Sequence, residues 1–247
     1  GRDHSSPERI PGAIVTEAYT HFQDPPSPAR GQRPLPAIDR LQGHARSWGL
    51  RPEATVVIYD FDRSMTAARA WWTLKWAGVP DVRVLDGGFP AWLAAGLPTT
   101  RDAPAPTPSD IVLTPGHMPE FDGDEAARLA EHGLLLDARI RANYIGGPTG
   151  PGEPRRGHIP GAISAPTIDN LLDSGVFADS ATLREMYRGL GVTEHTAVGV
   201  YCGAGMSAAH TVLALAAIGI DAAMYPGSWS QYISEPAHPA VVGARVY

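Results

Sequence analysis

The chain has 247 residues, 43% of them hydrophobic and 19% charged, which suffices for one large domain or two ordinary ones with separate cores. Its net charge of −6, with acidic and basic residues interspersed, disfavours a nucleic-acid partner, because binding phosphates needs a concentrated basic face. No apolar run reaches the ~18 residues of a membrane helix, and the first residues lack the layout of a signal peptide, so we expect no membrane partner. The single cysteine, Cys202, cannot form an internal disulfide, which predicts the reducing cytoplasm.

The two halves of the chain contain the same features in the same order, which predicts a tandem repeat. In the first half these are IPGA at 10–13, ATVVIYD, a helical pattern over 66–77 with Gly78, and VRVLDGGFPAW. In the second half they are IPGA at 159–162, TAVGVYC, a helical pattern over 207–218 with Gly219, and AAMYPGSWSQY. Thr66 and Ser207 are the expected N-caps of the two helices, and both glycines are expected at C′.

A proline-rich stretch separates the halves, with six prolines between residues 98 and 119 and no helical or strand period. It predicts an N-terminal domain over 1–104, an extended linker over 105–117 and a C-terminal domain over 118–247. A strand candidate, LLLDAR at 134–139, precedes the second IPGA. Its counterpart in the first half would fall before residue 1, so the first domain lacks its first strand here and we expect a segment upstream.

Short apolar strands alternate with helices in each half, and this alternation predicts an α/β fold with mainly parallel sheets flanked by helices on both faces. The second half offers LLLDAR, AVGVYC and AAMY as strands, with helices expected around 180–190 and 208–218. Ligands of such sheets bind beyond the carboxyl ends of the strands, which is where Cys202 is expected.

A lone cysteine is most often buried and inert, but the neighbours of Cys202 favour a reactive thiol. Gly203 and Gly205 can turn main-chain N–H groups toward one point, and the helix that follows directs its positive end to the same point. An anion is favoured there, and the thiolate of Cys202 is the nearest candidate.

Three familiar thiolate chemistries fit this loop poorly. A cysteine phosphatase needs an arginine where Ala208 stands, and a thioredoxin-type site needs a second cysteine. A papain-like hydrolase needs a histidine beside the nucleophile, whereas His210 is expected to be packed or on the surface. A small ring of amides instead suits a persulfide, Cys–S–S⁻, which an external acceptor must resolve.

Over almost its full length the chain resembles the tandem-domain sulfurtransferases of the rhodanese/3-mercaptopyruvate sulfurtransferase family. The motifs that carry the resemblance are IPGA twice, RPLP, RAWWTLKWAG, RVLDGG, LLLDAR, GEPRRGHIPGA, CGAGMS and GSWSQY. The resemblance implies two tandem rhodanese-like domains, the first inactive with Asp60 at the cysteine position. It implies that Cys202 is catalytic and that the substrate sulfur is bound by the rest of its loop, namely Gly203, Ala204, Gly205, Met206 and Ser207.

The resemblance also bears on the donor, because thiosulfate-type members carry C-R-K-G-V-T and mercaptopyruvate-type members carry C-G-[ST]-G-V-T. CGAGMS is closer to the second, and Arg155 matches an arginine that holds the substrate carboxylate. Three positions depart from the mercaptopyruvate pattern. Ala204 replaces the loop serine, Asn143 replaces a second substrate-binding arginine, and Arg33 replaces a histidine whose acidic partner aligns near Tyr19. The Ser–His–Asp arrangement is therefore absent, and we expect Arg33 to supply some of the lost positive charge.

The sequence thus predicts a sulfurtransferase that moves a sulfane sulfur from a small anionic donor, with 3-mercaptopyruvate favoured, to a thiol, cyanide or thioredoxin-like acceptor through a Cys202 persulfide. A thiosulfate:cyanide sulfurtransferase stays open as an alternative. So does an interaction module that carries or senses sulfur with little turnover. No cofactor is expected, and no metal, because the histidines show no ligand spacing.

Overall fold

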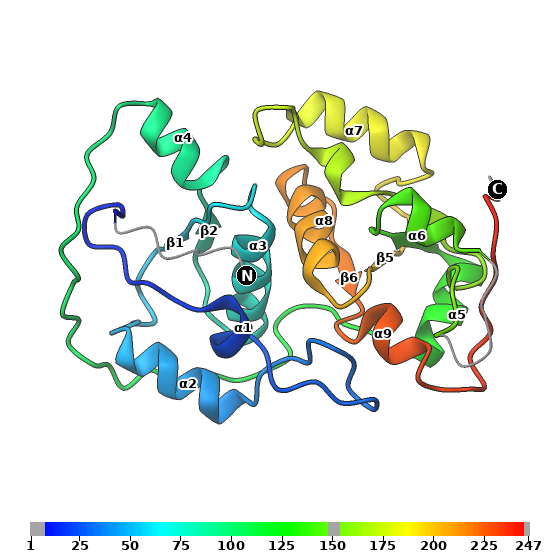
Figure 1. Ribbon diagram of the computed structural model, residues 1–247, viewed down its shortest axis with the longest axis horizontal. Helices are drawn as coiled ribbons and strands as arrows, with labels where there is room; N and C mark the ends of the chain where they lie inside the picture. Colours follow the sequence, from blue (N-terminus) through cyan, green and yellow to red (C-terminus); the bar gives the residue numbers. More distant parts are fainter. Residues whose placement is uncertain (1–7, 148–153, 245–247) are drawn as a thin grey trace. The chain divides into compact units, whose positions relative to one another are not determined.

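The computed structural model describes residues 8–147 and 154–244, which form two compact units, each built around its own parallel sheet (Figure 1). The first unit comprises the chain up to Gln23, then Leu35–His117 and Ser174–Val176. The second comprises Asp24–Pro34, Met118–Asp173 and Phe177 onward. Each unit thus includes a short segment from the other half of the sequence, and the domain boundaries expected at 104/105 and 117/118 stay a prediction.

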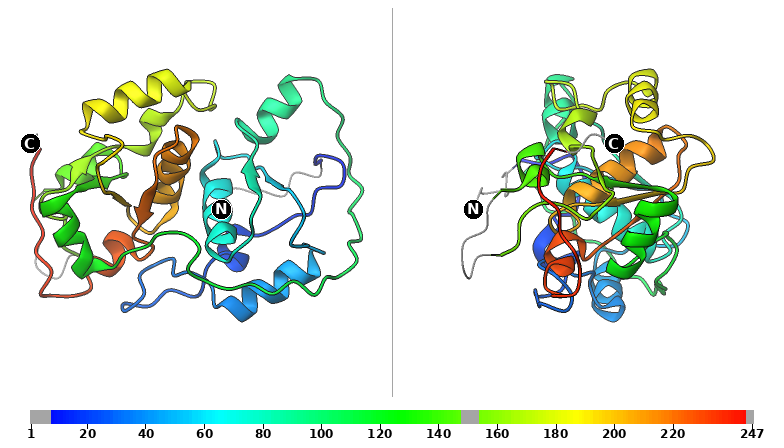
Figure 2. Two further views of the ribbon diagram at one scale, coloured as in Figure 1. Left: turned by 180° about the vertical axis from the view of Figure 1, so that it is seen from behind. Right: turned by 90° about the vertical axis from the view of Figure 1, so that its right-hand side faces the viewer.

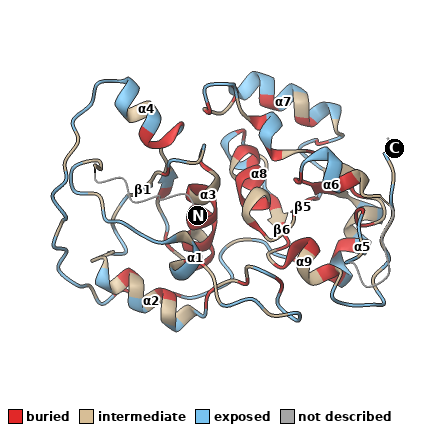
Figure 3. Cartoon of the chain, in the orientation of Figure 1, coloured by how far each residue is buried: buried red, intermediate tan, exposed pale blue. Residues whose placement is uncertain are grey.

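The first unit holds a small parallel sheet and four helices in its described residues. The order is α1 (Ala18–His21), α2 (Ile38–Ser47), β1 (Val56–Ile58), α3 (Met65–Trp76), β2 (Val82–Val84) and α4 (Gly88–Ala94). Strands β1 and β2 pair in parallel, and no counterpart of the expected first strand lies among the residues that the structure describes. Helix α3 is buried along most of its length, and Trp72 and Leu41 are fully enclosed (Figure 3).

The second unit is built on a parallel sheet in the order β4-β3-β5-β6. Figure 2 shows the chain from two further sides. Its elements are α5 (Gly123–His132), β3 (Leu134–Asp137), α6 (Arg141–Ile145), β4 (Ile163–Ser164), the 3₁₀ helix η1 (Thr167–Asn170), α7 (Ser180–Gly189), β5 (Val198–Tyr201), α8 (Met206–Ala217), β6 (Ala222–Met224) and α9 (Ser228–Tyr232). The predicted strands and helices of this half are confirmed, as is their parallel pairing. Within the described chain, every helix is too short or too polar to cross a bilayer.

The central strand β5 explains why the two faces of this sheet need different residues. Alternate residues of a strand face opposite sides, so Gly199 and Tyr201 share the face that α5 covers. A Cβ at Gly199 would lie 2.0 Å from a methyl of Leu129 and 2.9 Å from the ring of Phe121, so glycine lets α5 approach closely. Cys202 directly follows β5 and therefore lies at the carboxyl end of a central strand.

Equivalent contacts in the two units confirm the predicted repeat. The amide of Ile10 in the first IPGA donates to the hydroxyl of Tyr59 at 3.2 Å, and the amide of Ile159 in the second donates to Tyr201 at 3.1 Å. Each tyrosine directly precedes the residue under comparison, Asp60 or Cys202. The same turn therefore rests on the same strand end in both repeats.

The ends of the paired helices α3 and α8 match the sequence-based expectation only in part. Gly78 and Gly219 lie at C′ with φ of 89° and 80°, as expected. The N-caps expected at Thr66 and Ser207 are wrong, because each helix begins earlier. Ser64 and Gly205 cap the helices in the left-handed conformation and make no side-chain cap bond, so the usual preference for a serine or threonine acceptor does not apply.

The proline-rich stretch lacks helices and strands, but much of it is anchored to the first unit. Ile111 and Leu113 are buried, and the Leu113 amide donates to the side-chain oxygen of Gln42 at 2.9 Å. Arg46 in α2 donates from Nε to the Ile111 carbonyl at 2.9 Å. These contacts give an extended segment a fixed course without secondary structure.

His158, beside the second IPGA, is a buried histidine with one satisfied ring nitrogen. Its Nδ1 lies 2.9 Å from the Tyr144 carbonyl, which can only accept, so Nδ1 carries the proton. Nε2 is buried and has no hydrogen-bond partner in the described structure. Burial is the largest influence on His158 and lowers its pKa below the usual value, so the ring is held neutral.

We predict that His158 makes the protein less stable in mild acid. The unfolded chain takes up its proton near pH ~6.5, whereas the folded ring resists protonation until a lower pH. Stability from the neutral ring is therefore complete above pH ~6.5 and falls as the pH drops through the folded pKa, by at most about 1.4 kcal/mol per pH unit. Urea unfolding of wild type and His158→Asn between neutral and mildly acidic pH measures this. The exposed control His132→Asn should keep the wild-type slope, and an unchanged slope in His158→Asn would contradict the assignment.

A candidate active site around Cys202

The loop 202–205 joins the carboxyl end of β5 to the start of α8, as the sequence predicted for Cys202. Gly205 takes φ of 83°, a conformation open to glycine, and thereby turns the chain directly from strand into helix. Cys202 is only 2% exposed, while Gly203 and Ala204 are half-buried. The thiol thus lies just beneath the surface of the loop.

Two groups contact the sulfur of Cys202. The amide of Gly205 donates to Sγ at 3.0 Å. The hydroxyl of Ser228 lies 3.8 Å from Sγ, accepts from the Cys202 amide at 3.2 Å and lies 2.8 Å from the Tyr225 carbonyl. A hydroxyl has one proton, and the carbonyl is the nearer acceptor, so the Gly205 amide is the stronger donor to the sulfur.

Ser228 is a site residue that the sequence reasoning missed. It is fully buried and has φ of 51°, a left-handed conformation that costs a residue with a Cβ about 1–2 kcal/mol. The equivalent residue of the first unit is Gly88, with φ of 57°. The next residue makes the same bond in both units. The Phe89 amide donates to the Asp60 carbonyl, and the Trp229 amide donates to the Cys202 carbonyl, both at 2.9 Å. The sequence signal for Ser228 was that a serine stands at a position where the first repeat has glycine.

The equivalent loop of the first unit, which begins at Asp60, binds the carboxylate of Asp60 with hydrogen bonds. The Asp60 carboxylate is buried and accepts the amides of Asp62, Ser64 and Ala67 and the hydroxyl of Thr66, all at 2.9–3.0 Å. The first loop has one more residue before its helix than the second, as the caps at Ser64 and Gly205 show. Both loops nevertheless end a parallel strand and begin a helix.

Side-chain length makes the two loops comparable in chemistry. In aspartate the charged oxygens lie one bond beyond Cγ, and in a persulfide the charged sulfur lies one bond beyond Sγ. A carboxylate at this position collects four hydrogen bonds in the first unit. A loop of this type can therefore bind an anion at the position that the outer sulfur of a persulfide would occupy. Main-chain N–H groups are the principal donors.

The other predicted site residues lie in different surroundings. Arg155 donates to three main-chain carbonyls after α9, those of Ile233 at 2.9 Å, Glu235 at 2.7 Å and His238. These bonds tie down the segment after α9 and use three of the five N–H donors of the guanidinium. Asn143 is exposed in α6, and Arg33 is half-buried in the segment Asp24–Pro34.

A buried ion pair supports the floor of the site. Arg139 and Asp137 are both buried, with Nε 2.9 Å from Oδ1, and the guanidinium lies 4.6 Å from the centre of the Trp229 ring. Burial raises the pKa of the neighbouring Tyr201 well above its usual range, so its hydroxyl stays protonated. Among the described residues, no group of three or more histidine, cysteine and acidic side chains could hold a metal ion.

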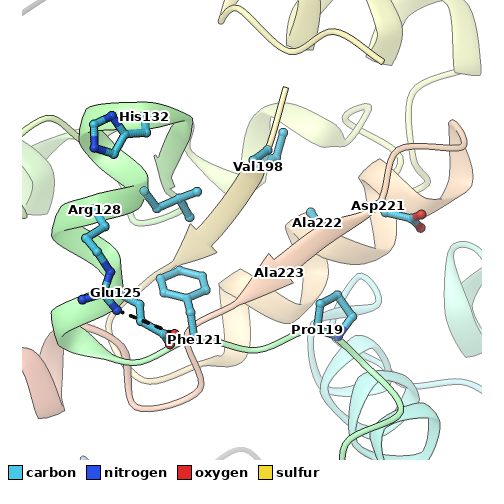
Figure 4. Close-up of a pocket in the computed structure, with 11 residues that line it drawn as sticks. Pro119, Phe121, Glu125, Arg128, His132, Val198, Asp221, Ala222 and Ala223 are labelled. Carbon is cyan, nitrogen blue, oxygen red and sulfur yellow. Dashed lines mark ion pairs between the residues drawn. The ribbon is translucent and has the colours of Figure 1, made fainter. Parts of the chain in front are cut away.

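An open cavity of about 500 Å³ lies at the opposite end of this sheet (Figure 4). Its lining includes Val198 and Ala222, the first residues of β5 and β6, with Phe121 and Leu129 beside them. Since the strands are parallel, their first residues lie away from the carboxyl edge that carries Cys202. The cavity therefore does not belong to the thiol site.

Comparison with known proteins assigns the family. The family described as Rhodanese-like domain matches residues 2–95 and 122–235, so the chain belongs to it and contains two such domains. It is 37% identical over 235 residues to the "Putative thiosulfate sulfurtransferase SseB" of Mycobacterium tuberculosis, covering 93% of this chain and 82% of that protein. It is 38% identical over 246 residues to the "Probable 3-mercaptopyruvate sulfurtransferase" of Pseudomonas aeruginosa, covering 95% and 84%.

A solved structure agrees in fold. The crystal structure of YnjE superposes with a TM-score of 0.85 at 25% identity; the match covers 96% of this chain but spans only 59% of the YnjE chain. The predicted fold class and the tandem rhodanese-like repeat are thereby confirmed. The predicted enzyme class, a sulfurtransferase, is confirmed by the names of the relatives.

We predict that the Asp60 cradle contributes measurably to stability. Asp60→Asn replaces an accepting oxygen by an N–H group that faces other donors, so the free energy of unfolding should fall by about 1–3 kcal/mol. Urea unfolding followed by tryptophan fluorescence measures it, since Trp71, Trp72 and Trp76 report on the first unit. The exposed control Asp102→Asn should stay within about 0.5 kcal/mol of wild type. Equal stability of the two variants would show that the bonds to the replaced oxygen add nothing.

Proposed function

We propose that the protein transfers a sulfane sulfur from a small anionic donor, with 3-mercaptopyruvate favoured, to a thiol or cyanide acceptor through a persulfide on Cys202. The observation that carries this proposal is the Gly205 amide directed at Sγ, together with the carboxylate cradle at the equivalent Asp60 loop. The remaining amides of the loop, from Gly203 to Ser207, are proposed to bind the sulfur once it is added.

The proposed reaction has two halves. The Cys202 thiolate attacks the sulfur of 3-mercaptopyruvate, the carbon–sulfur bond breaks, and its electron pair leaves on the enolate of pyruvate. The enolate takes up the thiol proton, giving pyruvate and Cys–S–S⁻. In the second half, cyanide or an acceptor thiolate attacks the outer sulfur, and the Cys202 thiolate leaves. Amide hydrogen bonds to the outer sulfur would stabilise the charge that it carries between the two halves.

The choice of donor is argued from the side chains of the loop. Gly203, Ala204, Gly205 and Met206 carry no charge, which suits a monoanionic donor better than the dianion thiosulfate. Thiosulfate stays the second candidate. In that reaction the thiolate attacks the outer sulfur of thiosulfate and sulfite leaves.

A sulfur carrier with little turnover is the alternative of a different class. The 2% exposure of Cys202 favours it, because a buried sulfur is slow to meet small reactants but can be reached by a partner that moves the loop. A thioredoxin-like protein is the acceptor proposed for either case. We also propose that the protein acts in the cytoplasm, where a single thiol stays reduced, and without a nucleic-acid or membrane partner.

The donor-binding roles of three residues belong to the same proposal. Arg155 would orient the donor carboxylate with the N–H groups that its three carbonyl bonds do not use, while those bonds hold the segment 233–238. Asn143 would offer its exposed amide, and Arg33 a positive charge. Replacing Arg33 by alanine should raise the donor KM if that charge is used.

Cys202→Ser should abolish sulfur loading and leave the fold intact. A hydroxyl at this position cannot form a persulfide, although it preserves the size of the side chain approximately. Intact-mass spectrometry after incubation with 3-mercaptopyruvate should show the added mass of one sulfur atom in wild type and none in the variant. Because the chain has one cysteine, loading of the variant would contradict the covalent scheme outright.

Ala204→Ser should raise activity with 3-mercaptopyruvate relative to thiosulfate. A hydroxyl at this half-buried loop position can donate to the carbonyl oxygen on which charge develops, an interaction that thiosulfate cannot use in the same way. We expect the ratio of kcat/KM for the two donors to move by about tenfold toward 3-mercaptopyruvate. Gly203→Ser, one residue earlier and with open space around its Cβ, is the matched control. An equal shift in both variants would refute a specific role for position 204.

A further inference from the structure

The short helix α9 is the element that fixes the far side of the Cys202 loop. The amide of Trp229 donates to the Cys202 carbonyl, and the amide of Ser230 donates to the Gly203 carbonyl, both at 2.9 Å. With Ser228 bonded to the Cys202 amide, three successive residues of α9 hold two successive residues of the loop. A displacement of α9 must therefore be transmitted to the thiol.

The same turn of helix is held from its other side by the segment Asp24–Pro34, which we call the arm. Ser230 Oγ accepts the amide of Gln32 at 2.9 Å. Gln231 Nε2 donates to the Ala29 carbonyl at 2.7 Å, and Ser234 Oγ lies 2.7 Å from the Pro28 carbonyl. The arm belongs to the second unit although it precedes the first unit's α2 in the sequence.

The arm has a defined shape that lets it reach α9. Ser27 and Gly31 form an antiparallel bridge, and Arg30 pairs with Asp24 at 2.8 Å. Gly31 is buried with φ of 83°, and a Cβ there would lie 2.8 Å from the Gly227 carbonyl and 2.9 Å from Ser230 Oγ. Only a glycine lets the arm pack this closely against the start of α9.

We propose that the arm is a positioning element for the thiol and that Ser230 is its positioning residue. Ser230 joins the two contacts directly, since its hydroxyl binds the arm while its amide binds the Cys202 loop. Attachment of the arm thereby keeps the Gly205 amide directed at Sγ. The inference deepens the function proposed above and rests on it for its effect on turnover, but the geometry of the thiol can be measured without turnover.

Ser230→Ala tests the link, because it removes the acceptor for Gln32, together with the hydroxyl's own bond to the Gly227 carbonyl at 3.1 Å, and leaves the Ser230 amide in place. The bond from Gln231 to the arm remains, so donor KM should stay within about twofold while kcat falls about tenfold. The rate at which iodoacetamide alkylates Cys202 should rise about tenfold, because a loop that α9 no longer holds uncovers the buried sulfur. Intact mass reports this rate without ambiguity in a chain with one cysteine. Ser230→Thr retains the hydroxyl and should restore both rates.

Gly31→Ala tests the arm from its own side without altering α9. Its added methyl should separate the arm from Gly227 and Ser230, and speed alkylation as Ser230→Ala does. Gly12→Ala is the matched control, because Gly12 has φ of 81° and open space around its Cβ. The control carries the same backbone penalty without the collision and should alkylate at the wild-type rate.

Wild-type rates of alkylation in both Ser230→Ala and Gly31→Ala would overturn the proposal, whatever their melting temperatures, because the arm would then be merely structural. An equal rise in Gly12→Ala would overturn it as well, since it would trace the effect to general destabilisation. Failure of the proposed function gives a different result, namely no sulfur loading of the wild type with any donor. The alkylation rates would still report on the arm in that case.

Discussion

Main-chain N–H groups that gather around one negative charge at the end of a parallel strand are the interaction on which this molecule depends. The turn that builds this arrangement occurs twice, because both repeats end a strand, turn through a left-handed residue and begin a helix. In the first unit the charge belongs to the protein itself, as the Asp60 carboxylate. In the second, a thiol stands in its place and one amide is directed at it. The carboxylate of the first loop is satisfied by its own protein, whereas the thiol of the second is the group on which the proposed function places the transferred sulfur.

Backbone strain and a buried ion pair lie close to the Cys202 loop. Ser228 takes a left-handed conformation that the first unit assigns to Gly88, and the cost of about 1–2 kcal/mol is offset by bonds to the Cys202 amide and to Tyr225. The guanidinium of Arg139 is paired with Asp137 and lies over the ring of Trp229, the residue that follows Ser228. Both therefore lie next to the thiol, and backbone strain is commonly found at functional sites.

Much of the fold was predictable because its signals are local and repeated. The apolar strands, the glycines that end α3 and α8, and the two IPGA turns are each readable from a few neighbouring residues. The N-caps were not, because a left-handed cap needs no side-chain acceptor. Thr66 and Ser207, which have the hydroxyl of a typical cap, each lie two residues after the cap that the structure shows.

The site was less predictable, because its contacts join residues far apart in the chain. Comparison of the repeats singles out Ser228 opposite Gly88, but it does not reveal the bond to Cys202, 26 residues away. The arm and α9 are separated by about two hundred residues, as the bond between Gln32 and Ser230 shows. Arg155 was assigned to a substrate by resemblance, and only the structure reveals the carbonyls that it binds.

The most direct test of the central claim is a crystal structure of the wild-type protein after loading with 3-mercaptopyruvate. The account predicts an outer sulfur on Cys202 within hydrogen-bonding distance of several amides of its loop, including Gly205, in the manner of the Asp60 carboxylate. An outer sulfur packed against apolar side chains, with those amides directed elsewhere, would contradict it.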